Sequence, residues 1–138
     1  MSNFIINIEQ NQQEGLLETA FAGENLSKGD ICYLGTDSKY YKAQSNALLT
    51  CSTEIRLCLQ DMSINTSGSF LIRGKFLTTQ ILTSGSLYYI SDTVEGEIVL
   101  SISDSVNNYK RKIGTAYSSN TLEFNPSETL SLNGSIIN

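Results

Sequence analysis

The sequence contains no histidine and no tryptophan among its 138 residues, and it contains a single proline. Without histidine, Ser–His and Cys–His nucleophile pairs, imidazole general bases and most zinc sites are excluded. Three dispersed cysteines cannot complete a four-ligand zinc site without carboxylates, and no phosphate-binding glycine loop or EF-hand motif occurs. These absences predict a protein that is not an enzyme and that holds neither a metal nor a cofactor.

Pairs of carboxylates are the remaining source of catalytic chemistry, since two acids suffice for glycoside hydrolysis. Glu95 and Glu97 lie in an expected turn, and with Asp92 they would form a calcium site whose spacing matches no known loop closely. Glu14 and Glu18 lie near the amino end. Both pairs are typical of solvated turn charges. An enzyme is therefore the third hypothesis, and it requires two buried carboxylates that face one pocket.

Basic residues are scarce: nine Lys and Arg stand against fourteen Asp and Glu, the net charge is −5 and the pI is near 4.6. Nucleic-acid binding requires a basic patch, and the one cluster, Lys110-Arg111-Lys112, is interpreted as a solvated strand or loop start. No apolar run approaches the length of a membrane span, and the start of the chain lacks the features of a signal peptide. We expect no nucleic acid and no membrane as partners.

The three cysteines, Cys32, Cys51 and Cys58, form an odd set without the CxxC spacing of metal or redox sites. Cys32 and Cys58 have apolar neighbours and are expected to behave as small hydrophobes. Cys51 and Cys58 could meet across a hairpin. A reduced protein assembled in the cytoplasm is the simpler hypothesis.

What the sequence does contain is a regular series of short apolar runs. They are separated about every eight to twelve residues by Gly, Ser, Asn or Asp, which is typical of antiparallel strands in a barrel or sandwich. Residues 65–68 can turn a hairpin, with Gly68 able to take a positive φ. The predicted strands are 4–9, 15–22, 31–34, 40–43, 56–59, 68–77, 87–91, 98–100, 112–116 and 121–124.

These strands predict an all-β chain with one antiparallel β-barrel or sandwich domain over residues 15–126. An amino-terminal arm or edge strand, 1–14, precedes the domain, and a carboxyl-terminal tail, 127–138, follows it. Both ends are expected to be extended.

An internal near-repeat suggests how the domain is built. Residues 26–34, LSKGDICYL, return as residues 82–90, LTSGSLYYI. Each copy is followed by a second short strand and then a hairpin. The pattern predicts two similar β-units that pack into one domain, because neither could bury its apolar face alone. Gly29 and Gly85 are expected to take a positive φ or to permit a close backbone approach as the chain enters a strand.

The two ends of the chain are the best candidates for contacts with other molecules. Residues 4–9 alternate in a way that suits a strand added to a sheet edge. The apolar tail beyond Pro126 would be a hazard if exposed, so it lies either against its own domain or against a neighbouring subunit. The candidate subunit or capsid contacts are Phe4, Ile6, Ile8, Leu130, Leu132, Ile136 and Ile137.

Two tyrosine doublets, Tyr40-Tyr41 and Tyr88-Tyr89, favour a second kind of contact. Neighbouring residues of a strand point to opposite faces, so one ring of each doublet is expected in the core and the other outside. Exposed rings of β-sandwich modules often stack against sugars. The absence of tryptophan counts against glycan binding.

With these features in view, the chain resembles a β-rich domain of tailed-bacteriophage virion proteins: capsid decoration proteins, head fibres and some tail-fibre modules. The likeness covers roughly residues 20–126 and concerns packing and turn motifs. Its elements are GDICYL at 29–34, YYKA at 40–43, GSLYYIS at 85–91, GEI at 96–98, RKIGTA at 111–116 and FNP at 124–126.

The resemblance implies a homotrimer on a capsid or fibre, and its motifs define no functional residues. Because the sequence has no long fibre shaft, we expect a capsid decoration (cement) protein that binds the major capsid protein or another virion protein. Such a protein would be assembled in the host cytoplasm and located on the virion surface. The alternative is a tail or head-fibre adhesin module that binds a host glycan.

Overall fold

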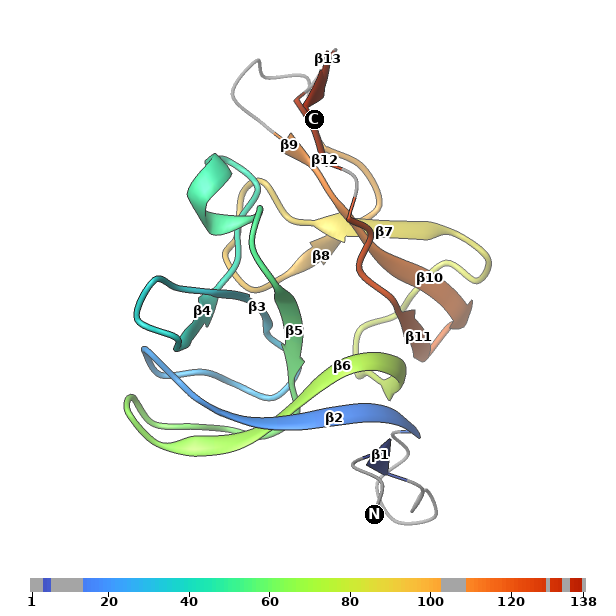
Figure 1. The fold of residues 1–138 in the computed structure, drawn as a ribbon. Helices are drawn as coiled ribbons and strands as arrows, with labels where there is room; N and C mark the ends of the chain where they lie inside the picture. The colour runs from blue at the N-terminus through green and yellow to red at the C-terminus, as the bar shows by residue number, and fades with distance from the viewer. Residues whose placement is uncertain (1–3, 6–13, 103–108, 129, 133–134, 138) are drawn as a thin grey trace.

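Figure 1 shows the computed structural model, which describes residues 4–5, 14–102, 109–128, 130–132 and 135–137. Within these residues the chain consists of short β-strands joined by turns and one short 3-10 helix, η1 (Leu48–Thr50). The expected all-β class is confirmed. The strands are β1 (Phe4–Ile5), β2 (Glu14–Phe21), β3 (Ile31–Leu34), β4 (Tyr40–Lys42), β5 (Ile55–Cys58), β6 (Ser67–Leu77), β7 (Leu87–Ile90), β8 (Ile98–Val99), β9 (Tyr109–Lys110), β10 (Lys112–Ser118), β11 (Thr121–Phe124), β12 (Leu130–Leu132) and β13 (Ser135–Ile137).

The strands form one large curled sheet and one small sheet. The large sheet contains ten strands, and all the ladders between its named strands in the described residues are antiparallel. The small sheet has the order β13-β12-β9 and is also antiparallel. The expected antiparallel architecture is therefore confirmed.

Strand β6 makes the large sheet fork. Along one edge, its residues 67–75 pair with β2. On the opposite edge, residues 70–71 pair with β5 and residues 74–77 pair with β11. Ile72 is an extra residue relative to β2, because its two neighbours in β6 pair with consecutive residues of that strand. Two partners thus share one edge of β6, on either side of this bulge.

The two branches of the fork have the same internal order. The path through the sheet is β4-β3-β5-β6-β11-β10-β7-β8. We call β3, β4, β5 and β6 the first quartet, and β7, β8, β10 and β11 the second quartet. In each quartet the first strand along the chain lies between the second and the third, and the third pairs with the fourth. The two fourth strands, β6 and β11, join the quartets.

The same turn leads into the first strand of each quartet. Gly29 and Gly85 have φ of +96° and +85°, as the repeat predicted. In both turns the residue after the glycine donates its N–H to the carbonyl three residues earlier, at 3.0 and 3.1 Å. Each glycine N–H donates to the third strand of its own quartet, to Cys58 and to Ala116, at 2.8 Å in both cases.

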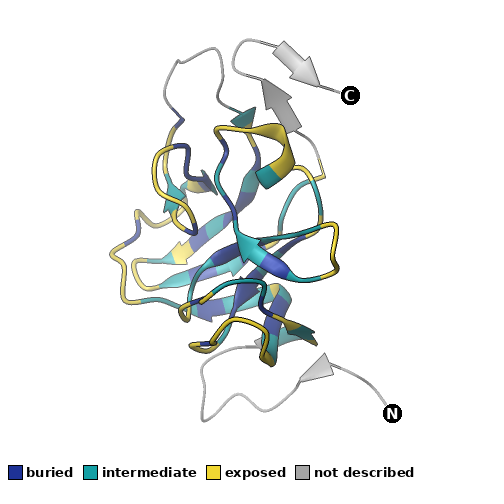
Figure 2. Ribbon diagram, turned by 90° about the vertical axis from the view of Figure 1, so that its left-hand side faces the viewer, coloured by how far each residue is buried: buried dark blue, intermediate teal, exposed yellow. Residues whose placement is uncertain are grey.

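Buried apolar side chains form a main core and a smaller cluster, and exposed residues gather in the loops (Figure 2). The main core draws on both quartets, so each quartet covers apolar surface of the other. It comprises Ile31, Ala43, Cys51, Ile55, Leu57, Leu71, Phe76, Leu82, Tyr88, Ile90, Ile113, Ala116, Leu122 and Phe124. The smaller cluster comprises Ala22, Leu26, Cys32, Tyr40, Cys58, Met62 and Phe70.

Most predicted strands are confirmed. Strands 31–34 and 121–124 have the predicted bounds, and those between 15 and 116 differ by one or two residues at an end. Of the predicted strand 4–9, residues 6–9 lie outside the described part. The elements η1, β9, β12 and β13 were not predicted, since runs of two or three residues are too short to show a period.

The turn before β6 differs from the prediction. Asn65, not Gly68, has the positive φ, of +67°. Asparagine tolerates this conformation because its short side chain can form local hydrogen bonds. Gly68 lies in β6, where it pairs with Ala20 of β2, so the ladder begins earlier than predicted.

All three cysteines are buried and free. Cys51 lies in the main core, whereas Cys32 and Cys58 lie in the smaller cluster, so the suggested approach of Cys51 to Cys58 is wrong. Burial raises the pKa of all three thiols, to about 11 for Cys51 and Cys58. At neutral pH the thiols are therefore protonated and shielded.

Thiol labelling at pH 8 tests this burial, because the thiolate is the reactive form. We expect the folded protein to react with Ellman's reagent only as fast as it unfolds, and denatured protein to release three equivalents at once. A thiol that reacts in the folded protein at the rate of free cysteine would contradict the structure.

Replacement of the turn glycines tests the equivalence of the two turns. Gly29→Ala and Gly85→Ala should each lower the free energy of unfolding by about 1–2 kcal/mol, because alanine is strained at positive φ. A Cβ at either position meets no atom closer than 3.7 Å, so backbone strain accounts for the loss. Chemical denaturation measures both values, and Ser84→Ala, at an exposed neighbour, should leave stability unchanged. A loss at only one glycine would show that the turns differ.

Candidate functional site

A surface groove of about 800 Å³ lies at the fork of the sheet, and its volume is typical of ligand-binding pockets. Ile72 and Arg73 form part of its wall, and they lie between the portion of β6 that pairs with β5 and the portion that pairs with β11. Other walls come from β3, the β3–β4 turn, the loop before β5 and residues 125–128 after β11. Because β5 and β11 share one edge of β6, the two branches diverge and leave the groove between them.

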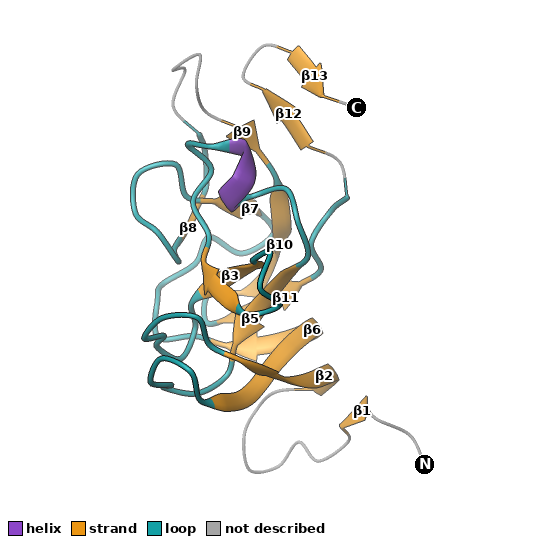
Figure 3. Ribbon diagram, turned by 60° about the vertical axis from the view of Figure 1, so that its left-hand side comes forward, coloured by secondary structure: helices purple, strands orange, loops and turns teal. Residues whose placement is uncertain are grey.

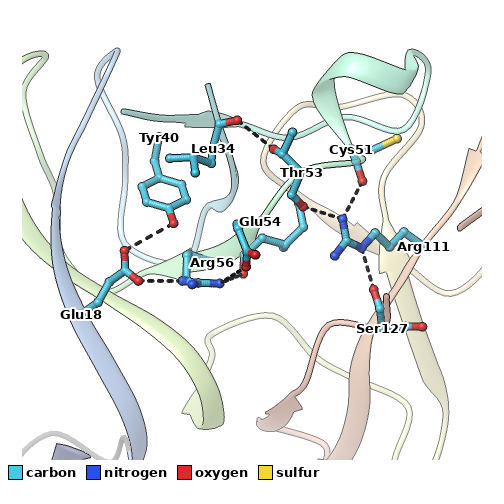
Figure 4. Close-up of polar contacts among 10 residues, drawn as sticks. Glu18, Leu34, Tyr40, Cys51, Thr53, Glu54, Arg56, Arg111 and Ser127 are labelled. Carbon is cyan, nitrogen blue, oxygen red and sulfur yellow. Dashed lines mark hydrogen bonds and ion pairs between the residues drawn. The ribbon is translucent and has the colours of Figure 1, made fainter. Parts of the chain in front are cut away.

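Arg111, between β9 and β10, joins the walls of this groove (Figure 4). Its side chain is buried, and its Nε donates to the carbonyl of Ser127 at 2.7 Å. Its Nη1 donates to the carbonyls of Cys51 at 3.0 Å and Thr53 at 2.6 Å. The guanidinium therefore holds the loop before β5 and the segment after β11 in place.

The interpretation of residues 110–112 as a solvated basic cluster is wrong at its middle residue. Successive residues of an extended chain point to opposite sides, so Lys110 is exposed while Arg111 is buried. Burial lowers the pKa of Arg111 from its usual value. Within the described residues, Arg111 forms no ion pair.

The charge of Arg56 in β5, by contrast, is balanced. Its Nε forms an ion pair with Glu18 at 3.0 Å, and its Nη1 forms one with Glu54 at 3.1 Å. Glu18 also accepts a hydrogen bond from the hydroxyl of Tyr40 at 3.3 Å (Figure 4). Burial of Tyr40, together with the nearby Glu18 carboxylate, raises the pKa of its hydroxyl. These contacts attach β5 to β2 and β4.

Two tyrosines supply an aromatic wall of the groove. Tyr33 of β3 and Tyr41 of β4 are cross-strand partners, with ring centroids 5.8 Å apart and planes tilted by 31°. The Tyr41 hydroxyl donates to Asp37 at 2.5 Å, and this hydrogen bond raises the pKa of Tyr41 and lowers that of Asp37. Both rings are half-buried, so each keeps some of its surface open to solvent.

The predicted division of the tyrosine doublets is confirmed. Tyr40 and Tyr88 are 2% and 3% exposed, whereas Tyr41 and Tyr89 are half-buried. Tyr41 borders the groove, and Tyr89 belongs to the second quartet.

Three residues of the acidic pairs considered from the sequence have described side chains, and these have different surroundings. Glu95 and Glu97 are exposed, and Glu18 is engaged by Arg56 and Tyr40. In the part of the chain that the structure describes, no group of three or more Cys, Asp or Glu residues is placed to hold a metal ion.

Of the contacts predicted at the chain ends, none that the structure describes lines the groove. Phe4 pairs with Leu16 of β2, and Ile6 and Ile8 lie outside the described residues. In the tail, Leu130 pairs with Ile137, so the backbone of β12 and β13 forms a hairpin against β9. Leu132 and Ile136 belong to the same hairpin.

No protein-family model and no curated protein matches the chain. Among the residues that the structure describes, no helix is both long and apolar enough to span a membrane.

The importance of Arg111 can be tested by substitution. Arg111→Met should lower the free energy of unfolding by about 3 kcal/mol or more, because three carbonyls lose a charged donor. Denaturant titration measures the loss, and Lys110→Met, at an exposed neighbour, serves as the control. Equal stability of the two variants would contradict the structural role of Arg111.

Proposed function

We propose that the chain is a non-enzymatic virion structural protein, a capsid decoration protein that forms homotrimers and attaches to the capsid surface. The carrying observation is that β1 and the β12–β13 hairpin lie at opposite ends of the molecule (Figure 3). Each of them extends a sheet by strand pairing. The resemblance at residues 20–126 also supports this proposal.

Both terminal elements offer backbone to a partner. In the described residues β1 pairs only with β2, and β13 pairs only with β12. An edge strand carries unpaired N–H and C=O groups, and a strand from another chain can satisfy them. Two such edges at opposite ends suit a protein that joins its own copies at one end and a protein shell at the other.

We also propose that the domain arose from two similar β-units. The shared strand order of the quartets and the matching hydrogen bonds of the turns at Gly29 and Gly85 support this. Residues 26–34 and 82–90 are similar in sequence, and the segments that follow them are also similar in the order of their strands. Each unit alone would leave its side of the main core exposed.

Attachment by many weak contacts fits such a role. Copies bound to a repeating lattice, or linked in a trimer, gain from high effective concentration, so no single contact needs to be strong. Light scattering of the purified chain should give three times the 15.2 kDa monomer mass. Purified capsids of the cognate phage should carry the protein down in sedimentation. A protein that is strictly monomeric and does not sediment with these capsids would overturn the proposal.

Truncations show which end of the chain is needed for trimer formation and which for capsid binding. Removal of residues 1–12 takes away β1, and removal of residues 129–138 takes away β12 and β13. We expect one truncation to abolish trimer formation and the other to abolish capsid binding, with little change in the unfolding transition of either. Replacement of residues 129–138 by a Gly-Ser segment of equal length controls for chain length. If both truncated proteins still form trimers and bind capsids, the terminal strands do not make these contacts.

The groove favours a second candidate, a module that binds host glycan. Two half-exposed rings, Tyr33 and Tyr41, form one wall of a cavity large enough for a short oligosaccharide. Sugar rings present C–H groups that pack on the faces of aromatic rings. A capsid or fibre protein can combine both roles, since none of the described residues of β1, β12 and β13 lines the groove.

A further inference from the structure

The groove gathers the arginines of this protein. All three arginines of the chain, Arg56, Arg73 and Arg111, line it, and none of the six lysines does. Arginine differs from lysine in its planar fork of donors, which matches the two oxygens of a carboxylate. This segregation is unexpected for a chain whose basic residues are few.

Arg111 brings a charge that no ion pair in the described part of the protein neutralises, although the Glu54 and Glu128 carboxylates lie near enough to favour it. Its side chain is only 8% exposed, and its three hydrogen bonds go to neutral carbonyls. Buried charges in proteins are normally paired with an opposite charge. An anion in the groove would supply that partner.

The third nitrogen of Arg111 is available to such an anion. Nε and Nη1 make the three hydrogen bonds, and Nη2 makes none in the described residues (Figure 4). Every fully buried side-chain nitrogen or oxygen in the described residues has a hydrogen-bond partner. Because Nη2 has none, it is not fully buried and retains contact with solvent. Since Arg111 lines the groove, this solvent is that of the groove.

Arg73 provides a second open guanidinium. It follows the bulge at Ile72, is exposed, and has no ion pair or side-chain hydrogen bond within the described residues. Arg56 differs from both, because Glu18 and Glu54 neutralise it.

We propose that the groove binds an acidic glycan. The carboxylate of one sugar is held by Arg111 and Arg73, and a sugar ring packs on Tyr33 and Tyr41. This inference rests on the glycan-binding candidate above and names its ligand class. A sugar suits the site better than a bare anion, because the same groove carries aromatic faces as well as hydroxyl and amide side chains.

Three carboxylates line the groove and oppose an anionic ligand: Asp37 is bonded to Tyr41, Glu54 is paired with Arg56, and Glu128 has neither kind of contact within the described residues. Glu128 lines the wall near Arg111 and is exposed, and it forms no ion pair in the described residues. Its charge repels an anion, so its removal should strengthen binding. This gives the proposal a variant that gains affinity.

The test is a titration of the intact, isotope-labelled chain, followed by NMR, with 3′-sialyllactose, lactose and inorganic phosphate as probes. We expect 3′-sialyllactose to shift the amide signals of Thr53, Arg111 and Ser127, and to bind at least about tenfold more tightly than lactose or phosphate. Trigalacturonic acid, with maltotriose as its neutral counterpart, repeats the comparison with a second acidic sugar. The proposal requires at least one acidic probe to behave in this way.

Variants then identify the contacts. Arg73→Gln should weaken binding of the acidic probe by about tenfold, and Glu128→Gln should strengthen it. Lys110→Gln, which removes the same charge outside the groove, should change nothing. Arg73 and Glu128 are both exposed, so these variants should fold, and their unfolding transitions verify this.

The outcomes separate the two proposals. Equal binding of acidic and neutral sugars would overturn the acidic-ligand inference and leave glycan binding intact. Phosphate binding as tight as that of the acidic sugar would overturn sugar recognition. No shift with any probe would overturn the glycan candidate as well, and capsid attachment would be unaffected.

Discussion

The fold depends on one limitation of strand β6: it has two edges and three partners. Strand β2 occupies one edge over residues 67–75, so β5 and β11 must divide the other. The extra residue Ile72 lies between the part of this edge that pairs with β5 and the part that pairs with β11, and it lets the strand bend there. From this division follow the divergence of the quartets, the main core that both of them cover, and the groove at the fork.

The fork also leaves backbone carbonyls that need hydrogen-bond donors, and Arg111 supplies them. Where two branches of a sheet diverge, the segments beside the gap lose ladder partners, and their carbonyls need other donors. With its planar guanidinium, Arg111 donates three hydrogen bonds, one each to the carbonyls of Cys51, Thr53 and Ser127. A lysine could not reach the same set in one plane. The residue that stabilises the gap is also the one that brings positive charge to it.

The sequence predicted the strands better than their arrangement. Alternation and turn residues located β2 and the strands of both quartets to within two residues at each end, and the repeat identified the turn glycines Gly29 and Gly85. The groove was not predictable in this way, because it depends on which strands share β6, and two of those partners, β2 and β11, lie about fifty residues from β6 along the chain. The burial of Arg111 had one local signal, its place between two lysines in an extended segment. Such alternation does not show which carbonyls the side chain meets.

The division of β6 has a consequence for how the protein is made. Residues 67–77 leave the ribosome well before β11, which spans residues 121–124. The part of β6 that pairs with β11, residues 74–77, therefore lacks that partner while the second quartet is being synthesised. Pairings this distant along the chain slow folding, and an open edge in a folding intermediate invites pairing with other chains. Completion of the sheet is thus one of the last events of folding. The nascent chain is most prone to aggregation just before β11 arrives.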